Sequence, residues 1–151
     1  MDTFFVDYLE RMKALFREFE VAIADVPPEG LNWQPGPDMN SIAVLIIHTA
    51  GSTRFWIGDI ALAESSNRDR SSEFAAHQLD ATALQARLAE VERYIETALP
   101  RLTDLAEARP VRQFDQEDTT VGWALLHALE HTAQHVGHVQ MTRQLWEQHN
   151  A

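Results

Sequence analysis

The sequence predicts an all-α protein, a four-helix bundle in one domain that covers residues 1–151. Apolar residues recur at steps of three and four along four long segments, which is the period of amphipathic helices. The chain contains no Asn-Gly or Asp-Gly pair, so the usual signals of tight β-hairpins are absent. Its length of 151 residues and its 45% hydrophobic content suit one packed core.

The first helix is predicted over residues 2–25, where six large apolar side chains form one stripe. Pro27 and Pro28 end it, because proline cannot continue the helical hydrogen-bond ladder. Residues 31–40 hold a tryptophan and two further prolines, and we expect them to form an ordered loop.

The second helix is predicted over residues 41–63, with Ser41 as its N-cap. It is unusually apolar, and residues 42–47 alone would also fit a short buried strand. A helix is favoured because the apolar pattern continues well beyond the length of a typical strand. Residues 64–70 then form a polar connection.

The third helix is predicted over residues 81–98, which carry a stripe of leucine, valine and isoleucine. Pro100 either ends or kinks this helix. The apolar residues at 102, 105 and 106 indicate a helical continuation beyond the proline. Residues 108–118, with Pro110 as a helix breaker, are expected to form a loop.

The fourth helix, capped by Thr119 or Thr120 and running to about Glu147, carries a stripe of histidines. Four histidines follow at offsets of 0, 4, 8 and 11: His127, His131, His135 and His138. At roughly 100° per residue they fall within about 80° of one another on the helix surface. Two histidines at i and i+4 can share one metal ion, and neutral imidazole suits zinc, nickel, copper and ferrous iron.

A third ligand must come from another segment, and His48 lies within the apolar second helix. An imidazole without a partner would be costly to bury there, and metal ligation would explain its position. The simpler alternatives are that His48 is a core histidine with a hydrogen-bond partner and that the stripe is a solvated face. His77 and His149 are expected to be exposed and to have no role.

Residues 127–131 also match the H-x-x-E-H motif of inverted zinc proteases. In this interpretation His127 and His131 bind zinc, and Glu130 activates a water molecule. A five-residue match with two histidines is easily met in a histidine-rich helix, so the motif has low specificity.

Composition excludes several classes of function. The net charge of -11 argues against binding to nucleic acid or to an anionic membrane surface, both of which need clustered Lys and Arg. The chain has no cysteine, so any metal must be held by nitrogen and oxygen ligands. No signal peptide or membrane-spanning run is evident, so we expect a cytoplasmic protein.

Two segments together resemble the DinB-like superfamily of metal-binding four-helix bundles. The first segment comprises residues 31–35 (LNWQP), 41–43 (SIA) and 45–50 (LIIHTA), and the second is 126–138 (LHALEHTAQHVGH). The resemblance implies a divalent metal ion, zinc, nickel or iron, held by His48, His131 and His135. It also implies a long crossover connection and, as in many members, a homodimer. His138 departs from the family pattern, since many members carry glutamine there.

Three hypotheses for the function follow. The first is an enzyme similar to relatives that use mycothiol or bacillithiol, in which the metal activates a small-molecule thiol that attacks an electrophilic substrate as an S-transferase or isomerase. The second is a metal-dependent hydrolase with Glu130 as proton acceptor. The third is a non-enzymatic, stress-associated protein whose metal is structural.

Overall fold

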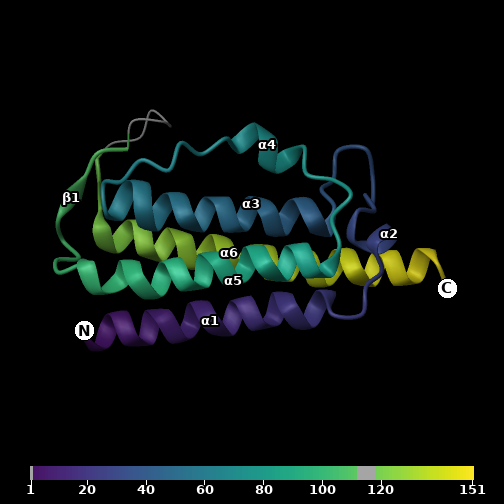
Figure 1. The fold of residues 1–151 in the computed structure, drawn as a ribbon, viewed down its shortest axis with the longest axis horizontal. Helices are drawn as coiled ribbons and strands as arrows, with labels where there is room; N and C mark the ends of the chain where they lie inside the picture. The colour runs from purple at the N-terminus through teal and green to yellow at the C-terminus, as the bar shows by residue number, and fades with distance from the viewer. Residues whose placement is uncertain (1, 112–117) are drawn as a thin grey trace.

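Four long helices lie side by side in the computed structural model, which describes residues 2–111 and 118–151 (Figure 1). They are α1 (Thr3–Ile23), α3 (Ile42–Arg54), α5 (Ala81–Ala98) and α6 (Val121–His149). Helices α1 and α6 run in one direction, and α3 and α5 run in the other. The segment between α3 and α5 returns along the bundle as a long crossover that contains α4 (Arg70–Phe74). The predicted four-helix bundle is confirmed.

Each long helix begins at a side chain that caps its free backbone amides. The caps are Asp2, Ser41, Asp80 and Thr120, whose side-chain oxygens accept hydrogen bonds from the backbone N–H of Phe4, Val44, Ala83 and Trp123. Such a cap stabilises a helix by about 0.5–2 kcal/mol. The predicted cap at Ser41 is confirmed, and of the two threonines considered before α6 the cap is Thr120.

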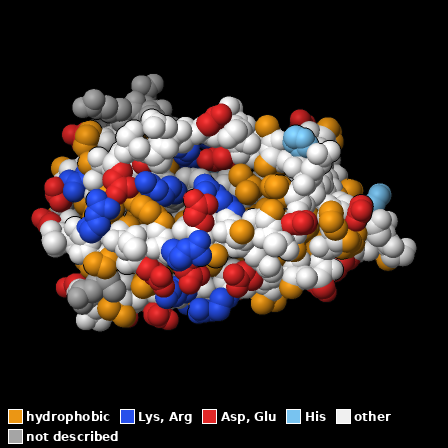
Figure 2. Space-filling model, in the orientation of Figure 1, with side chains coloured by type: hydrophobic (Ala, Val, Ile, Leu, Met, Phe, Trp, Pro, Cys, Tyr) orange, Lys and Arg blue, Asp and Glu red, His pale blue; other side chains and the backbone are white. Residues whose placement is uncertain are grey.

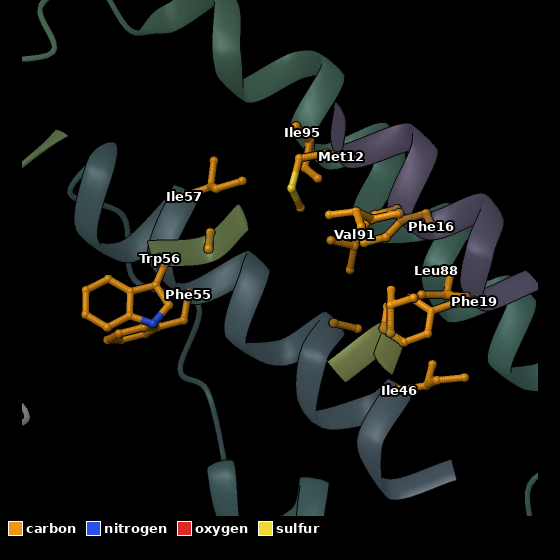
Figure 3. Packing of buried hydrophobic residues seen from close by; sticks show 14 of the residues in the cluster. Met12, Phe16, Phe19, Ile46, Phe55, Trp56, Ile57, Leu88, Val91 and Ile95 are labelled. Carbon is orange, nitrogen blue, oxygen red and sulfur yellow. The ribbon is translucent and has the colours of Figure 1, made fainter. Parts of the chain in front are cut away.

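The core fills the space enclosed by the four helices, because α1 and α3 each pack against both α5 and α6. Figure 3 shows aromatic and aliphatic side chains from these helices meeting there. Fully buried members include Met12, Phe16 and Phe19 of α1, Ile46 of α3, and Leu88 and Ile95 of α5. Burying each such side chain contributes about 1.5–3 kcal/mol relative to leaving it exposed.

Helix α3 is buried on nearly every side, which explains its continuous apolar run. Residues 42–46 are all buried, because α3 contacts α5 and α6 and is also covered by α4. The alternative of a short strand at this position is wrong. The apolar run fits a helix because the crossover shields the face that would otherwise meet solvent.

The second predicted helix continues beyond α3 as a π-helix, η1 (Phe55–Ala61). Gly58 lies where a β-carbon would collide with the guanidinium of Arg54 and with the hydroxyl of Tyr94. That guanidinium lies 3.9 Å from the centre of the Tyr94 ring. The widened turn is local, and π-turns of this kind often mark functional sites.

Three connections differ from the prediction. The helical continuation expected at residues 102–106 is wrong, because only one 3₁₀ turn, η2 (Leu99–Arg101), follows α5 and the chain then becomes extended. The loop expected at 108–118 contains β1 (Ala108–Arg109), which pairs antiparallel with β2 (Thr119–Thr120); residues 112–117 lie outside the described residues. A short helix, α2 (Pro28–Leu31), precedes the predicted ordered loop.

Charged side chains of both signs intermingle on the surface, as Figure 2 shows for one face. Arg54 pairs with Glu64 at 2.8 Å, and Arg87 pairs with Glu90 at 2.7 Å. Within the described ranges, none of the helices combines the length and the apolar character that crossing a membrane requires.

Candidate metal centre

Three imidazole rings from two helices converge between α3 and α6. Nε2 of His131 lies 3.1 Å from Nε2 of His48 and 3.2 Å from Nε2 of His135. One ligand atom from each ring lies within 4.8 Å of the others. His48 belongs to α3, whereas His131 and His135 occupy successive turns of α6. The fold thus brings together the three histidines that the family resemblance selects.

Close packing of α3 against α6 determines the position along the helix axes at which the three imidazole rings meet. Thr53 of α3 donates a hydrogen bond of 3.2 Å to the hydroxyl of Thr132, whose own proton goes to the carbonyl oxygen of Ala128. Both threonines are buried, and Thr132 directly follows His131 in the sequence. This buried polar contact fixes the axial register of the two helices one residue from the site.

A buried carboxylate orients His48. Nδ1 of His48 lies 2.9 Å from Oε2 of Glu73, and the same carboxylate accepts hydrogen bonds of 2.6 and 2.8 Å from Arg68. Burial would raise the pKa of Glu73, but the hydrogen bonds from Arg68 and His48 outweigh it and hold this pKa below its usual value. Because an ionised carboxylate only accepts, Nδ1 carries the proton and Nε2 presents its lone pair to the other rings. Gly51 leaves room for this carboxylate, since a β-carbon there would collide with it.

Burial keeps the other two imidazoles neutral. Desolvation, reinforced by the neighbouring imidazoles, lowers the pKa of His131 to about 3. Desolvation, together with His48 and His138, lowers the pKa of His135 to about 4. Nδ1 of His135 also lies 3.2 Å from Nδ1 of His138, which gives the ring a partner on its other side. Both rings therefore offer unprotonated nitrogen at neutral pH.

This set of donors fits a divalent metal ion. Two nitrogen ligands of a tetrahedral zinc ion, each about 2.0–2.1 Å from the metal, are separated by about 3.3 Å. The two short Nε2 separations at His131, 3.1 and 3.2 Å, are close to that value. Nδ1 of His131 is buried and has no hydrogen-bond partner in the described part of the chain, so the polar interactions of this ring depend on Nε2. A cation would satisfy the three converging lone pairs together.

A cavity of about 250 Å³ lies beside the converging group and is lined by His48 and His131 but not by His135. Two of the histidines contribute to its wall, together with basic, aromatic and hydroxyl side chains. The lining residues are His48, Ser52, Trp56, Arg68, Arg70, His127 and His131. Trp56 comes from the π-helix η1, so this irregular turn contributes directly to the wall of the cavity.

The fold agrees with the comparisons to known proteins. A family model described as the DinB superfamily matches residues 9–139. The chain belongs to the DinB superfamily. A crystal structure of a conserved protein from Enterococcus faecalis is similar to this DinB-superfamily chain, with a TM-score of 0.78 and 18% sequence identity over 96% of this chain and 97% of that one. At this identity the similarity establishes the fold alone. No curated protein sequence matches the chain.

Two other candidates in this DinB-superfamily protein lie apart from the converging nitrogen atoms. His127 packs against Trp56 and Trp123, with ring centres 4.4 and 5.0 Å away, and lines the cavity. Glu130 lies in a different groove, between α1 and α6. The geometry therefore gives no support to the H-x-x-E-H interpretation, which needs the ring of His127 in the cluster and Glu130 facing it.

The two remaining histidines are exposed, as expected. The ring of His149 nevertheless stacks on Trp33, with ring centres 5.4 Å apart, and so ties the end of α6 to the loop before α3. His77 lies in the connection between α4 and α5, where Nδ1 is 2.8 Å from the carbonyl oxygen of Ala75. Neither histidine belongs to the converging group.

The residues that surround His48 were missed by sequence reasoning. Arg68 and Glu73 lie in or just after the connection that was expected only to be polar, yet Glu73 is 6% exposed. Phe74 places its ring centre 4.6 Å from that of His48. The one signal in the sequence was Phe74, a large apolar residue at the end of a charged segment. This signal is too weak to predict a buried ion pair.

Proposed function

We propose that this protein is a metal-dependent enzyme in which a low-molecular-weight thiol attacks an electrophilic small molecule, as in a thiol S-transferase. The main support is the cavity of about 250 Å³ beside three converging histidines. A structural zinc site is closed by four protein ligands, whereas this group offers three and adjoins space for a substrate. The chain has no cysteine, so the reacting sulfur would come from a cosubstrate.

The roles of the surrounding residues follow from their contacts. His48, His131 and His135 would hold the ion. A divalent zinc, nickel or iron ion at this position would lower the pKa of a thiol and thereby supply a nucleophile at neutral pH. Glu73 and Arg68 keep His48 in the tautomer that presents Nε2, because the ionised carboxylate accepts the proton of Nδ1–H.

His127 is the residue best placed to accept the proton of the thiol. It lines the cavity, and it does not belong to the converging group. Burial lowers its pKa, against the opposing effect of Glu130, so the ring is neutral at pH 7. A neutral imidazole beside the substrate can act as a general base, and Trp56 and Trp123 restrict its orientation by packing on it.

Steady-state assays of the metal-loaded protein test this proposal, with mycothiol or bacillithiol as the thiol and a chloronitrobenzoate as the electrophile. A carbon–sulfur bond forms as the carbon–chlorine bond breaks, chloride leaves, and the thiol proton passes through His127 to solvent. The wild type should exceed His48→Ala by about 100-fold or more, which corresponds to about 2.7 kcal/mol of barrier. His77→Ala, which alters an exposed ring, should match the wild type. A wild-type rate equal to that of His48→Ala would refute the proposal.

A further inference from the structure

The cavity beside the histidines has a basic lining in a strongly acidic protein. The chain carries 23 acidic and 12 basic residues, yet the described residues that line the cavity include two arginines and no carboxylate. We infer that the molecule bound there carries a carboxylate and that Arg70 binds it. This inference rests on the thiol-dependent function proposed above and names the substrate class that the site would accept.

The two arginines differ in whether their charge is already balanced. Arg68 donates two hydrogen bonds to the buried carboxylate of Glu73, and its side chain is only 11% exposed. Arg70 is exposed, and no carboxylate of the described residues forms an ion pair with it. The guanidinium of Arg70 is therefore the cationic group at this cavity that remains available to a ligand.

Aromatic packing holds Arg70 at the site. Its guanidinium carbon lies 4.7 Å from the centre of the Phe74 ring, and the Phe74 ring lies 4.6 Å from that of His48. Both residues belong to α4, whose contact with α3 anchors them beside the histidines. A guanidinium held over a ring loses less freedom on binding an anion than an unsupported side chain would.

Ser52 supplies a second polar group. It is buried on α3, lines the same cavity, and makes no side-chain hydrogen bond with any residue in the described ranges. Its hydroxyl can donate to a carboxylate oxygen or accept from a polar substrate group. The single unpaired guanidinium balances one negative charge, and its planar N–H groups can donate two parallel hydrogen bonds to a carboxylate. A phosphate dianion carries two negative charges and would need further cations.

A binding experiment on the cobalt-substituted protein, used as the intact 151-residue chain, tests the inference without requiring turnover. Mercaptopropionate and its uncharged amide have the same thiol and nearly the same shape, and thiol binding to cobalt changes the visible absorption spectrum. The dissociation constant of each thiol is measured for the wild type, for Arg70→Gln and for Arg93→Gln. Arg93 is a matched control because it is exposed on α5 and does not line the cavity.

Arg70→Gln should weaken the binding of mercaptopropionate about fivefold relative to that of the amide, the size expected for a solvent-accessible ion pair. Arg93→Gln should leave the ratio of the two constants as in the wild type. The comparison between proteins cancels any difference in acidity between the two thiols. Added salt should reduce the preference in the wild type but not in Arg70→Gln.

Failure of the carboxylate inference and failure of the proposed thiol function would give different results in this experiment. If both thiols bind and Arg70→Gln leaves the ratio of their constants unchanged, the carboxylate inference is wrong while the thiol function stands. If cobalt binds but neither thiol alters its spectrum, the thiol function fails, and the inference that rests on it fails too.

Discussion

Replacing Glu73 by glutamine should weaken the binding of zinc about tenfold. The carboxylate receives three hydrogen bonds: Arg68 donates to both oxygens, and His48 donates to Oε2. A glutamine offers only one oxygen, so its amide nitrogen must face at least one of these donors. If the nitrogen takes the Oε1 position, it faces one N–H donor of Arg68. If it takes the Oε2 position, it faces two donors, one from Arg68 and one from His48. The variant should therefore keep a weaker, uncharged contact to His48.

Glu73→Ala removes every one of these contacts and should approach a 100-fold loss. Partners that orient metal-binding histidines typically contribute 10–100-fold in affinity, or about 1.4–2.7 kcal/mol. Competition with a chromophoric chelator measures the dissociation constants, and circular dichroism checks that each variant folds. Glu90→Gln is the control, because Glu90 pairs with Arg87 on the exposed surface. Zinc affinities of both Glu73 variants within twofold of the wild type would refute this role for Glu73.

Three further predictions follow from the same geometry. Gly51→Ala should reduce both zinc affinity and the urea midpoint of unfolding, since its β-carbon would displace the carboxylate of Glu73; a variant as stable and as tightly binding as the wild type would contradict the packing described. His127→Ala should leave zinc affinity unchanged in chelator competition, because the ring of His127 does not belong to the converging group, and a tenfold loss would revive the H-x-x-E-H interpretation, in which His127 is a ligand. In the metal-free protein, folding lowers the pKa of His131 from 6.5 to about 3 and the pKa of His135 from 6.5 to about 4. Between these values and 6.5, the unfolded chain therefore binds more protons than the folded chain does. Stability should be full above about pH 6.5 and decline as the pH falls toward 4; urea titrations of the metal-free protein that show no decline would contradict these shifts.

Periodicity in the sequence was sufficient to predict the four long helices. The stripe at residues 81–98 predicts α5 with the bounds observed, and Ser41 marks the start of α3. The i, i+4 spacing of His131 and His135 also predicts that the two rings share a face of one helix. These features are local, so a window of a few turns contains all the information they require.

Features that depend on distant contacts were not predictable in the same way. Strands β1 and β2 have two residues each and exist because they pair across a connection, so neither has a pattern of its own. The chain after Pro100 turns away from a helix, and the N–H of Gly122 instead donates to the carbonyl oxygen of Leu105. Glu73 carries no sequence mark of burial, because its two partners, one from α3 and one from the crossover, meet it only in the folded chain.

Metal analysis of the protein, purified without an affinity tag from medium containing zinc, nickel and iron, shows whether the three converging histidines bind an ion. We expect one divalent ion per chain in the wild type and in His77→Ala, and only background metal in His131→Ala. Equal metal contents in the wild type and in a correctly folded His131→Ala variant would contradict this expectation.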